Sequence, residues 1–164
     1  MNISQLLVPG AILLNNDAAD STTIIKRLGE LLYAAGYVKD GFIDATLARE
    51  ANMPTGLPLG GDFNAAIPHV DLVYVRKPAL ALATLSSPVV FHHMVMPEEE
   101  VQVQLVMMLA LDQPKSQIEM LQEIAEILQK PEVVSGLMSA NEVEEVFSVL
   151  GNLETAKSSG SNQA

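Results

Sequence analysis

Two segments in the first third of the chain have apolar residues three or four positions apart, which is the spacing of one helix face. The first segment follows Asp20, which can cap a helix, and stops at Gly36. The second opens at Asp40 or Gly41. The positions on the predicted apolar faces are Ile24, Leu28, Leu31 and Ala35 in the first helix, and Ile43, Leu47 and Ala51 in the second.

Shorter apolar runs, bounded by proline, glycine and polar residues, predict β-strands. The last of them begins with alternating apolar and polar residues and then becomes continuously apolar, which is typical of a strand buried on both faces. Turns are predicted at Ser86-Ser87-Pro88 and at Pro97–Glu100. The predicted strands are Ala11–Leu14, Phe63–Ile67, Ala79–Leu85, Val89–Val95 and Val101–Leu111.

The final third is predicted to be helical. One helix starts at the capping box that begins with Ser116, or earlier at Pro114, and a short helix runs from Pro131. Another capping box at Ser139 precedes the last helix. The end of the chain is rich in serine, glycine and asparagine and has no apolar periodicity. We therefore predict one domain over residues 1–152 and a disordered tail over residues 153–164.

The order of these elements predicts a single α/β domain with helices flanking the sheet. The strands between Phe63 and Val95 follow one another too closely for helical crossovers. They must therefore include antiparallel neighbours, and the sheet is expected to be mixed, with both parallel and antiparallel pairs.

Composition narrows the classes of function. The 164 residues carry 20 acidic against 9 basic side chains, a net charge of −11, which disfavours binding to nucleic acid or to an anionic membrane surface. The chain has no cysteine, which excludes disulfides and thiolate catalysis. It shows neither a signal-peptide pattern nor an apolar run of membrane-spanning length, so we expect a cytoplasmic protein.

The residues that point to chemistry surround His69. The predicted strand stops at Pro68, which places the following imidazole at the edge of the sheet. Arg49 lies upstream on a predicted helix, and the loop Thr55–Gly61 can present backbone N–H groups, from Thr55 and Gly56 onward, to an anion. An arginine, a glycine-rich loop and a histidine together suggest phosphate chemistry. The alternatives are a structural histidine, and an arginine that is solvated or paired with Glu50.

Other polar residues give weaker indications of a functional site. His92 and His93 are neighbours on a predicted strand and point to opposite faces, so they do not make a metal site with Glu98–Glu100. Asp71 follows His69 by two residues and can orient the ring. The loop Thr55–Gly61 lacks the Gly-Lys-Ser/Thr ending of a nucleotide-binding loop, so we expect no ATP.

In this order the motifs resemble the IIA component of the phosphoenolpyruvate-dependent sugar phosphotransferase system, of the mannitol/fructose class. The resemblance covers about Ile3 to Leu150. Its longer form, from Pro54-Thr55-Gly56-Leu57-Pro58 to Ala66-Ile67-Pro68-His69-Val70-Asp71, is most similar to the galactitol-type subgroup. The other matching pieces are the helix ending in Arg49-Glu50, the strand Val101–Leu111 and the helix Gln117–Leu128.

The resemblance implies a mannitol/fructose-type IIA fold and a phosphoryl relay. His69 would accept a phosphoryl group from the histidine phosphocarrier protein and pass it to a cysteine of a IIB component, which works with the membrane component IIC. Arg49 would neutralise the phosphoryl oxygens. Gln117 stands where many members have a second histidine, and its amide can donate a hydrogen bond. No cofactor is implied, because the donor arrives already activated.

Two other functions remain open at this level. One is a regulatory IIA-like protein of the nitrogen-related type, in which the phosphorylation state of His69 controls partner proteins. The other is a non-catalytic interaction module in which His69 is structural. The residues leave the sugar and the oligomeric state open.

Overall fold

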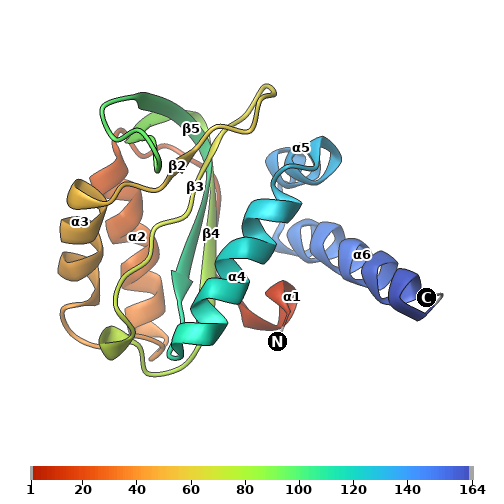
Figure 1. Ribbon diagram of the computed structural model, residues 1–164, viewed down its shortest axis with the longest axis horizontal. Helices are drawn as coiled ribbons and strands as arrows, with labels where there is room; N and C mark the ends of the chain where they lie inside the picture. Colours follow the sequence, from red (N-terminus) through yellow and green to blue (C-terminus); the bar gives the residue numbers. More distant parts are fainter. Residues whose placement is uncertain (1, 163–164) are drawn as a thin grey trace.

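The structure is a computed structural model, and it describes the backbone of residues 2–162 and the side chains of residues 2–153. It forms a five-stranded sheet with helices on both sides (Figure 1). The strands are β1 (Leu7–Asn16), β2 (Gly56–Leu57), β3 (Ala65–Ala66), β4 (Ala79–His92) and β5 (Glu100–Ala110). The helices are α1 (Ile3–Leu6), α2 (Ser21–Ala34), α3 (Phe42–Asn52), the short 3-10 helix η1 (Leu72–Tyr74), α4 (Pro114–Ile127), α5 (Pro131–Ser139) and α6 (Val143–Asn162).

The sheet is mixed, as predicted. Its strand order is β1-β4-β5-β3-β2. The pairs β1–β4 and β3–β5 are parallel, and the pairs β4–β5 and β2–β3 are antiparallel. Because β3 and β5 run in the same direction, the segments that follow them leave the sheet at the same edge.

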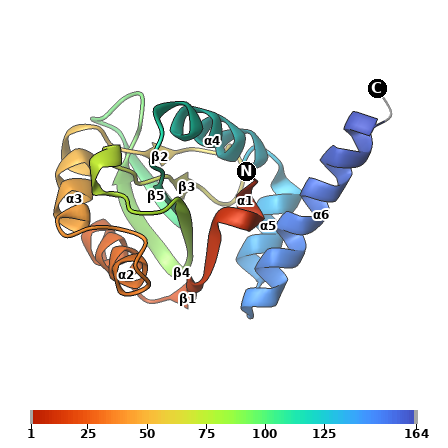
Figure 2. The same cartoon turned by 90° about the horizontal axis from the view of Figure 1, so that it is seen from below.

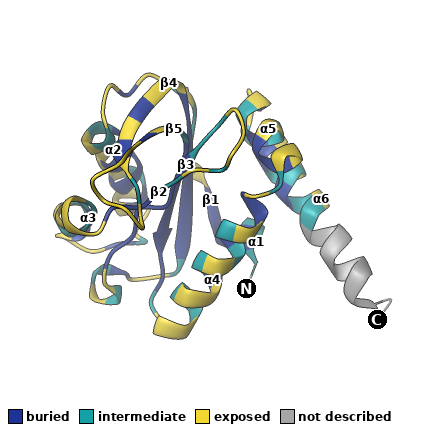
Figure 3. Ribbon diagram, turned by 45° about the horizontal axis from the view of Figure 1, so that its top comes forward, coloured by how far each residue is buried: buried dark blue, intermediate teal, exposed yellow. Residues whose placement is uncertain are grey.

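Two apolar cores lie on the two faces of the sheet. Helices α2 and α3 cover one face, and α1, α4, α5 and α6 gather on the other (Figure 2). Strand β5 contributes side chains to both cores, since Met108 packs in the core under α2 and α3 and Met107 packs in the core on the opposite face. This explains its continuous apolar run, and Figure 3 shows the buried sheet between helices whose outer faces are exposed.

The structure corrects several predicted strand limits. The region predicted as two strands with a turn at Ser86-Ser87-Pro88 is the single strand β4, so that turn is wrong. The three residues form an irregularity instead, where the pairing with β5 shifts between Thr84 and Val89. Strand β1 begins at Leu7, before Pro9-Gly10, because an edge strand tolerates a proline. Strand β3 is shorter than predicted, and β2 lies within the predicted loop.

The helices of the last third also differ from the prediction at their ends. Pro114 occupies the first turn of α4 and Gln113 is its N-cap, so Ser116 does not cap the helix. Ser139 is the last residue of α5 and therefore cannot cap α6. The backbone of α6 is helical as far as Asn162. The rest of the predicted tail, and the side chains from residue 154 on, lie outside the described residues.

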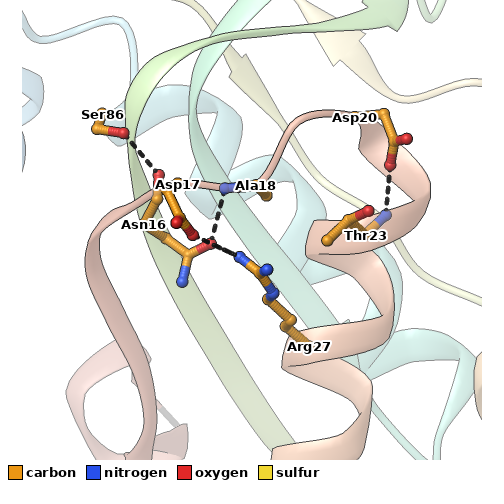
Figure 4. A network of polar contacts seen from close by, with 7 residues as sticks. All are labelled: Asn16, Asp17, Ala18, Asp20, Thr23, Arg27 and Ser86. Atoms are coloured by element: carbon orange, nitrogen blue, oxygen red, sulfur yellow. Dashed lines mark hydrogen bonds and ion pairs between the residues drawn. The ribbon is translucent and has the colours of Figure 1, made fainter.

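A polar cluster fixes the connection between β1 and α2 (Figure 4). The side-chain oxygen of Asn16 accepts from the backbone N–H of Ala18 at 3.1 Å and from Nη1 of Arg27 at 2.6 Å. Arg27 also pairs with Asp17 at 3.0 Å, and Asp20 caps α2 through the N–H of Thr23 at 2.8 Å. The cluster holds α2 to the edge strand, and α2 in turn supports α3.

Candidate functional site

Arg49 comes from the last turn of α3. It follows the buried Thr46 by three residues, which puts its side chain on the inner side of the helix. Its Nη2 lies 3.2 Å from Nε2 of His69. Its Nε is buried without a hydrogen-bond partner among the described residues. The guanidinium therefore meets the imidazole and keeps an unused donor beside it.

His69 follows β3 at the edge where β5 ends. Its neighbour Pro68 accepts a hydrogen bond from the N–H of Leu109 at 3.0 Å, which continues the β3–β5 ladder to this point. Nδ1 of the ring lies 2.8 Å from the carbonyl oxygen of Ile67. Only 5% of the residue is exposed. The ring is thus held at the edge of the sheet and shielded by its surroundings.

These contacts fix the tautomer of His69. A carbonyl oxygen only accepts, so Nδ1 carries the proton and donates to Ile67. A guanidinium only donates, so Nε2 presents its lone pair to Arg49. Burial lowers the pKa of His69 below its ordinary value, and the charge of Arg49 lowers it further, while the bond to Ile67 acts in the opposite direction. The ring is therefore neutral near pH 7, with Nε2 as its nucleophilic atom.

Thr55 and Gly56, expected to face an anion, are already engaged. The N–H and the hydroxyl of Thr55 each donate to an oxygen of the Glu50 carboxylate at 2.8 Å, and Thr55 is only 1% exposed. Gly56 pairs with Ala66, and a Cβ at this position would lie 2.5 Å from the carbonyl oxygen of His92. Thr55 therefore presents no free donor, and the pairing of Gly56 holds the segment between α3 and β3 in place.

Glu50 is the site residue that reasoning from the sequence missed. The sequence suggests it only as an ion-pair partner of Arg49, and no salt bridge joins the two within the described part of the chain. Its raised pKa has burial as the largest cause, against which both hydrogen bonds from Thr55 and the charge of Arg49 act. The sequence signal was the threonine five residues after the glutamate, which is within reach of a side chain at the end of a helix.

Gln117 lies early in α4, which begins just after β5 leaves the sheet (Figure 1). Its backbone N–H bonds to the carbonyl of Gln113 at 3.0 Å, and its side-chain Oε1 is buried without a partner among the described residues. No hydrogen bond joins it to His69 or Arg49 in the same part of the chain. The structure therefore places Gln117 at the start of α4 with an unpaired amide oxygen, and of the predicted site residues within the described part of the chain it brings only Arg49 into contact with the imidazole.

The remaining candidates have local contacts. His92 lies against the carbonyl of Pro97 at 2.9 Å, and Nδ1 of His93 accepts from the N–H groups of Val95 and Met96 at the tip of the β4–β5 hairpin. Asp71 precedes η1, and the carbonyl of Ile67 takes the orienting role that was considered for it. No group of three potential metal ligands occurs among residues 2–153.

The sequence of the chain matches a known protein family. Residues 5–152 match the family described as "Phosphoenolpyruvate-dependent sugar phosphotransferase system, EIIA 2". The chain belongs to this family. Members are phosphotransferases that work through a phosphohistidine intermediate, so this protein is a sugar-system phosphotransferase of that kind.

Individual relatives agree with the family. The galactitol-specific EIIA component of Escherichia coli is 30% identical over 125 residues, covering 76% of this chain and 82% of that protein. The crystal structure of the mannitol IIA from Escherichia coli is 26% identical with a TM-score of 0.73, over 88% of this chain and 98% of that one. A structure of the mannitol IIA in complex with phosphorylated IIB from Escherichia coli is 26% identical with a TM-score of 0.74, over 89% of this chain and 97% of that one. IIA domains of this family therefore pair with IIB components.

The described residues contain no helix long and apolar enough to cross a membrane.

Proposed function

We propose that this protein is a cytoplasmic phosphoryl carrier whose acceptor is Nε2 of His69. It takes the group from the histidine phosphocarrier protein and passes it to a cysteine of a IIB component that works with membrane-embedded IIC. The observation that carries the proposal is the pair of contacts on one ring: Ile67 holds Nδ1 and Arg49 faces Nε2. Together they leave the ring a single nucleophilic nitrogen, already beside a permanent positive charge.

The transfer is an in-line displacement at phosphorus. Nε2 of His69 forms a bond to phosphorus while the P–N bond of the donor phosphohistidine breaks, and that electron pair returns to the donor nitrogen. Each imidazole keeps the proton on its other nitrogen. The ring of His69 becomes more positive as the bond forms, and the carbonyl of Ile67 stabilises that charge through Nδ1–H. In the second transfer the thiolate sulfur of the cysteine forms a P–S bond as the Nε2–P bond breaks, and that electron pair returns to Nε2 of His69.

Arg49 supplies the neutralising charge. Its Nη2 covers Nε2 in the free protein, so the guanidinium must move aside with the incoming phosphoryl group and then bind its oxygens. The unpartnered Nε gives it a further donor for that role. Gln117 contributes a weaker contact: turning its amide over puts an N–H where the unpaired oxygen now lies. Thr55 and Gly56 act by holding the neighbouring backbone, not as direct ligands.

Exposed apolar side chains occur close in sequence to each of these residues. Met53 follows the helix of Arg49, Val73 lies in η1 after His69, and Ile118 follows Gln117; they are 57%, 68% and 57% exposed. Partners that must reach a buried ring need such a surface to dock on. The net charge of −11 suits partners with a basic face.

The substrate we assign is galactitol or a related polyol. Support comes from the 30% identity to the galactitol-specific component of Escherichia coli, together with the extended motif that runs from Pro54 to Asp71. The same relative favours sugar uptake over the nitrogen-regulatory role.

The test is phosphorylation in a reconstituted relay. The protein is incubated with phosphoenolpyruvate, enzyme I and the phosphocarrier, and acid-labile phosphate is measured. We expect label on the wild type and on the control His92→Ala, whose histidine is exposed, but none on folded His69→Ala. Label on His69→Ala would refute the assignment. Candidate IIB proteins then compete for the label, and transfer to a galactitol IIB in preference to a mannitol IIB supports the sugar assignment.

A further inference from the structure

Both oxygens of the Glu50 carboxylate accept hydrogen bonds from the same residue, Thr55. Oε2 accepts from the N–H of Thr55 and Oε1 from its hydroxyl, each at 2.8 Å. Thr55 is 1% exposed, so water cannot replace these bonds if the carboxylate is removed. The position of the Thr55 backbone therefore depends on Glu50.

The Thr55 backbone is connected to the reactive ring by two further bonds. Its carbonyl accepts from the N–H of Ile67 at 3.3 Å, and the carbonyl of Ile67 accepts from Nδ1 of His69 at 2.8 Å. The Gly56–Ala66 pair of the β2–β3 ladder lies beside the first of these bonds. A shift of Thr55 is therefore transmitted to the carbonyl that selects the tautomer of His69.

Glu50 is also the neighbour of Arg49 in the last turn of α3. One carboxylate thus ties the helix that carries the guanidinium to the segment that carries the imidazole. The 3.2 Å approach of Arg49 to His69 depends on the relative placement of these two segments.

We propose that Glu50, acting through Thr55 and Ile67, is a positioning residue that keeps the proton of His69 on Nδ1 and its Nε2 in register with Arg49. This inference rests on the proposed function of His69 but concerns a residue whose carboxylate bonds to Thr55 and, among the described residues, makes no hydrogen bond to the ring. It explains why the Thr55-Gly56 turn is part of the motif although its donors are not free.

The experiment uses the whole chain and three variants. Glu50→Gln keeps one acceptor oxygen and replaces the other with an NH₂ group, which would face a donor of Thr55. Thr55→Val replaces the hydroxyl by a methyl group, and Thr55→Ser keeps the hydroxyl. Glu144→Gln is the matched control, since Glu144 is exposed on α6. Two quantities are measured for each: the ¹⁵N NMR shifts of the His69 ring, which report the tautomer without any transfer, and the rate of phosphorylation by the phosphocarrier. Circular dichroism confirms that each variant is folded at the temperature used.

We expect Glu50→Gln to lose the clean Nδ1–H pattern and to be phosphorylated about tenfold more slowly, because a misplacement of a reacting group by about 1 Å can cost up to about 10²-fold and the shift expected here is smaller. Thr55→Val should show a smaller change of the same kind, and Thr55→Ser and Glu144→Gln should match the wild type. A folded Glu50→Gln with wild-type ring shifts and rate would overturn the inference while leaving His69 as acceptor. If Glu50→Gln does not fold, Thr55→Val decides on the same two measurements. Absence of label on the wild type would instead refute the proposed function, and the ring shifts would still test the role of Glu50.

Discussion

Replacing Arg49 by alanine should slow the phosphorylation of His69 far more than any other single change near the ring, apart from loss of the ring itself. Nη2 of Arg49 is 3.2 Å from Nε2 of His69, the proposed acceptor, so phosphoryl oxygens on that nitrogen would come within about 4 Å of the guanidinium. At that separation, and with the effective dielectric constant of about 20 that suits partly buried sites, one pair of unit charges interacts by about 4 kcal/mol. Part of this is recovered by solvent in the variant, so we expect a 10²- to 10³-fold loss of rate.

The assay is the initial rate of acid-labile labelling from the phosphorylated phosphocarrier at several protein concentrations. Arg49→Lys should recover part of the rate, because an ammonium keeps the charge but not the planar fork of donors. Arg76→Ala, which removes a cation from an exposed position elsewhere, is the control and should react like the wild type. The charge of Arg49 lowers the pKa of His69, so the pKa of the ring should rise in Arg49→Ala. A labelling rate within threefold of wild type, with an unchanged ring pKa, would refute the role given to Arg49.

Three further outcomes are expected. Gln117→Ala should slow labelling less than Arg49→Ala, about two- to tenfold, because it removes a neutral donor only; equal or reversed rates would show that this ranking of charge over amide is wrong. Gly29→Ala should lower the free energy of unfolding in urea titrations by about 1 kcal/mol or more, since the new Cβ would lie 2.6 Å from a side-chain carbon of Ile43 in α3. The control Gly151→Ala, where a Cβ meets open space, should raise the free energy of unfolding by about 0.5–1 kcal/mol. Finally, burial lowers the pKa of His69 below 6.5, so the unfolded chain binds the proton more readily than the folded protein. The free energy of unfolding should therefore fall as the pH drops from 6.5 toward the folded pKa, and it should fall less in His69→Gln. Parallel curves of stability against pH for the two proteins would contradict the effect of burial.

The meeting of Arg49 and His69 could be predicted because its signals are local. Pro68 marks the end of the apolar run before His69, and the periodicity of α3 places Arg49 on a helix that stops near the sheet. The engagement of Thr55 by Glu50 could not be predicted, because a glutamate at a helix end and a threonine in the next loop have many possible partners. What decides between them is the burial of Thr55, a property of the assembled fold.

The errors in the predicted fold have the same origin. Ser86-Ser87-Pro88 has the composition of a turn, yet β4 continues through it because β5 runs alongside on both sides of the irregularity. The predicted strand Ala11–Leu14 starts only after Pro9-Gly10 because a proline is excluded from central strands, and the strand order alone shows that β1 is an edge strand. Local composition determines where a strand can break, and pairing with a distant segment determines whether it does.

The most direct measurement is the NMR spectrum of the phosphorylated protein labelled with ¹⁵N at histidine. Since Ile67 holds Nδ1 of His69 and leaves Nε2 as the nucleophile, phosphorus should couple to Nε2 of His69 while Nδ1 keeps its proton. Phosphorus on Nδ1 of His69, or on His92 or His93, would contradict the mechanism derived from this site.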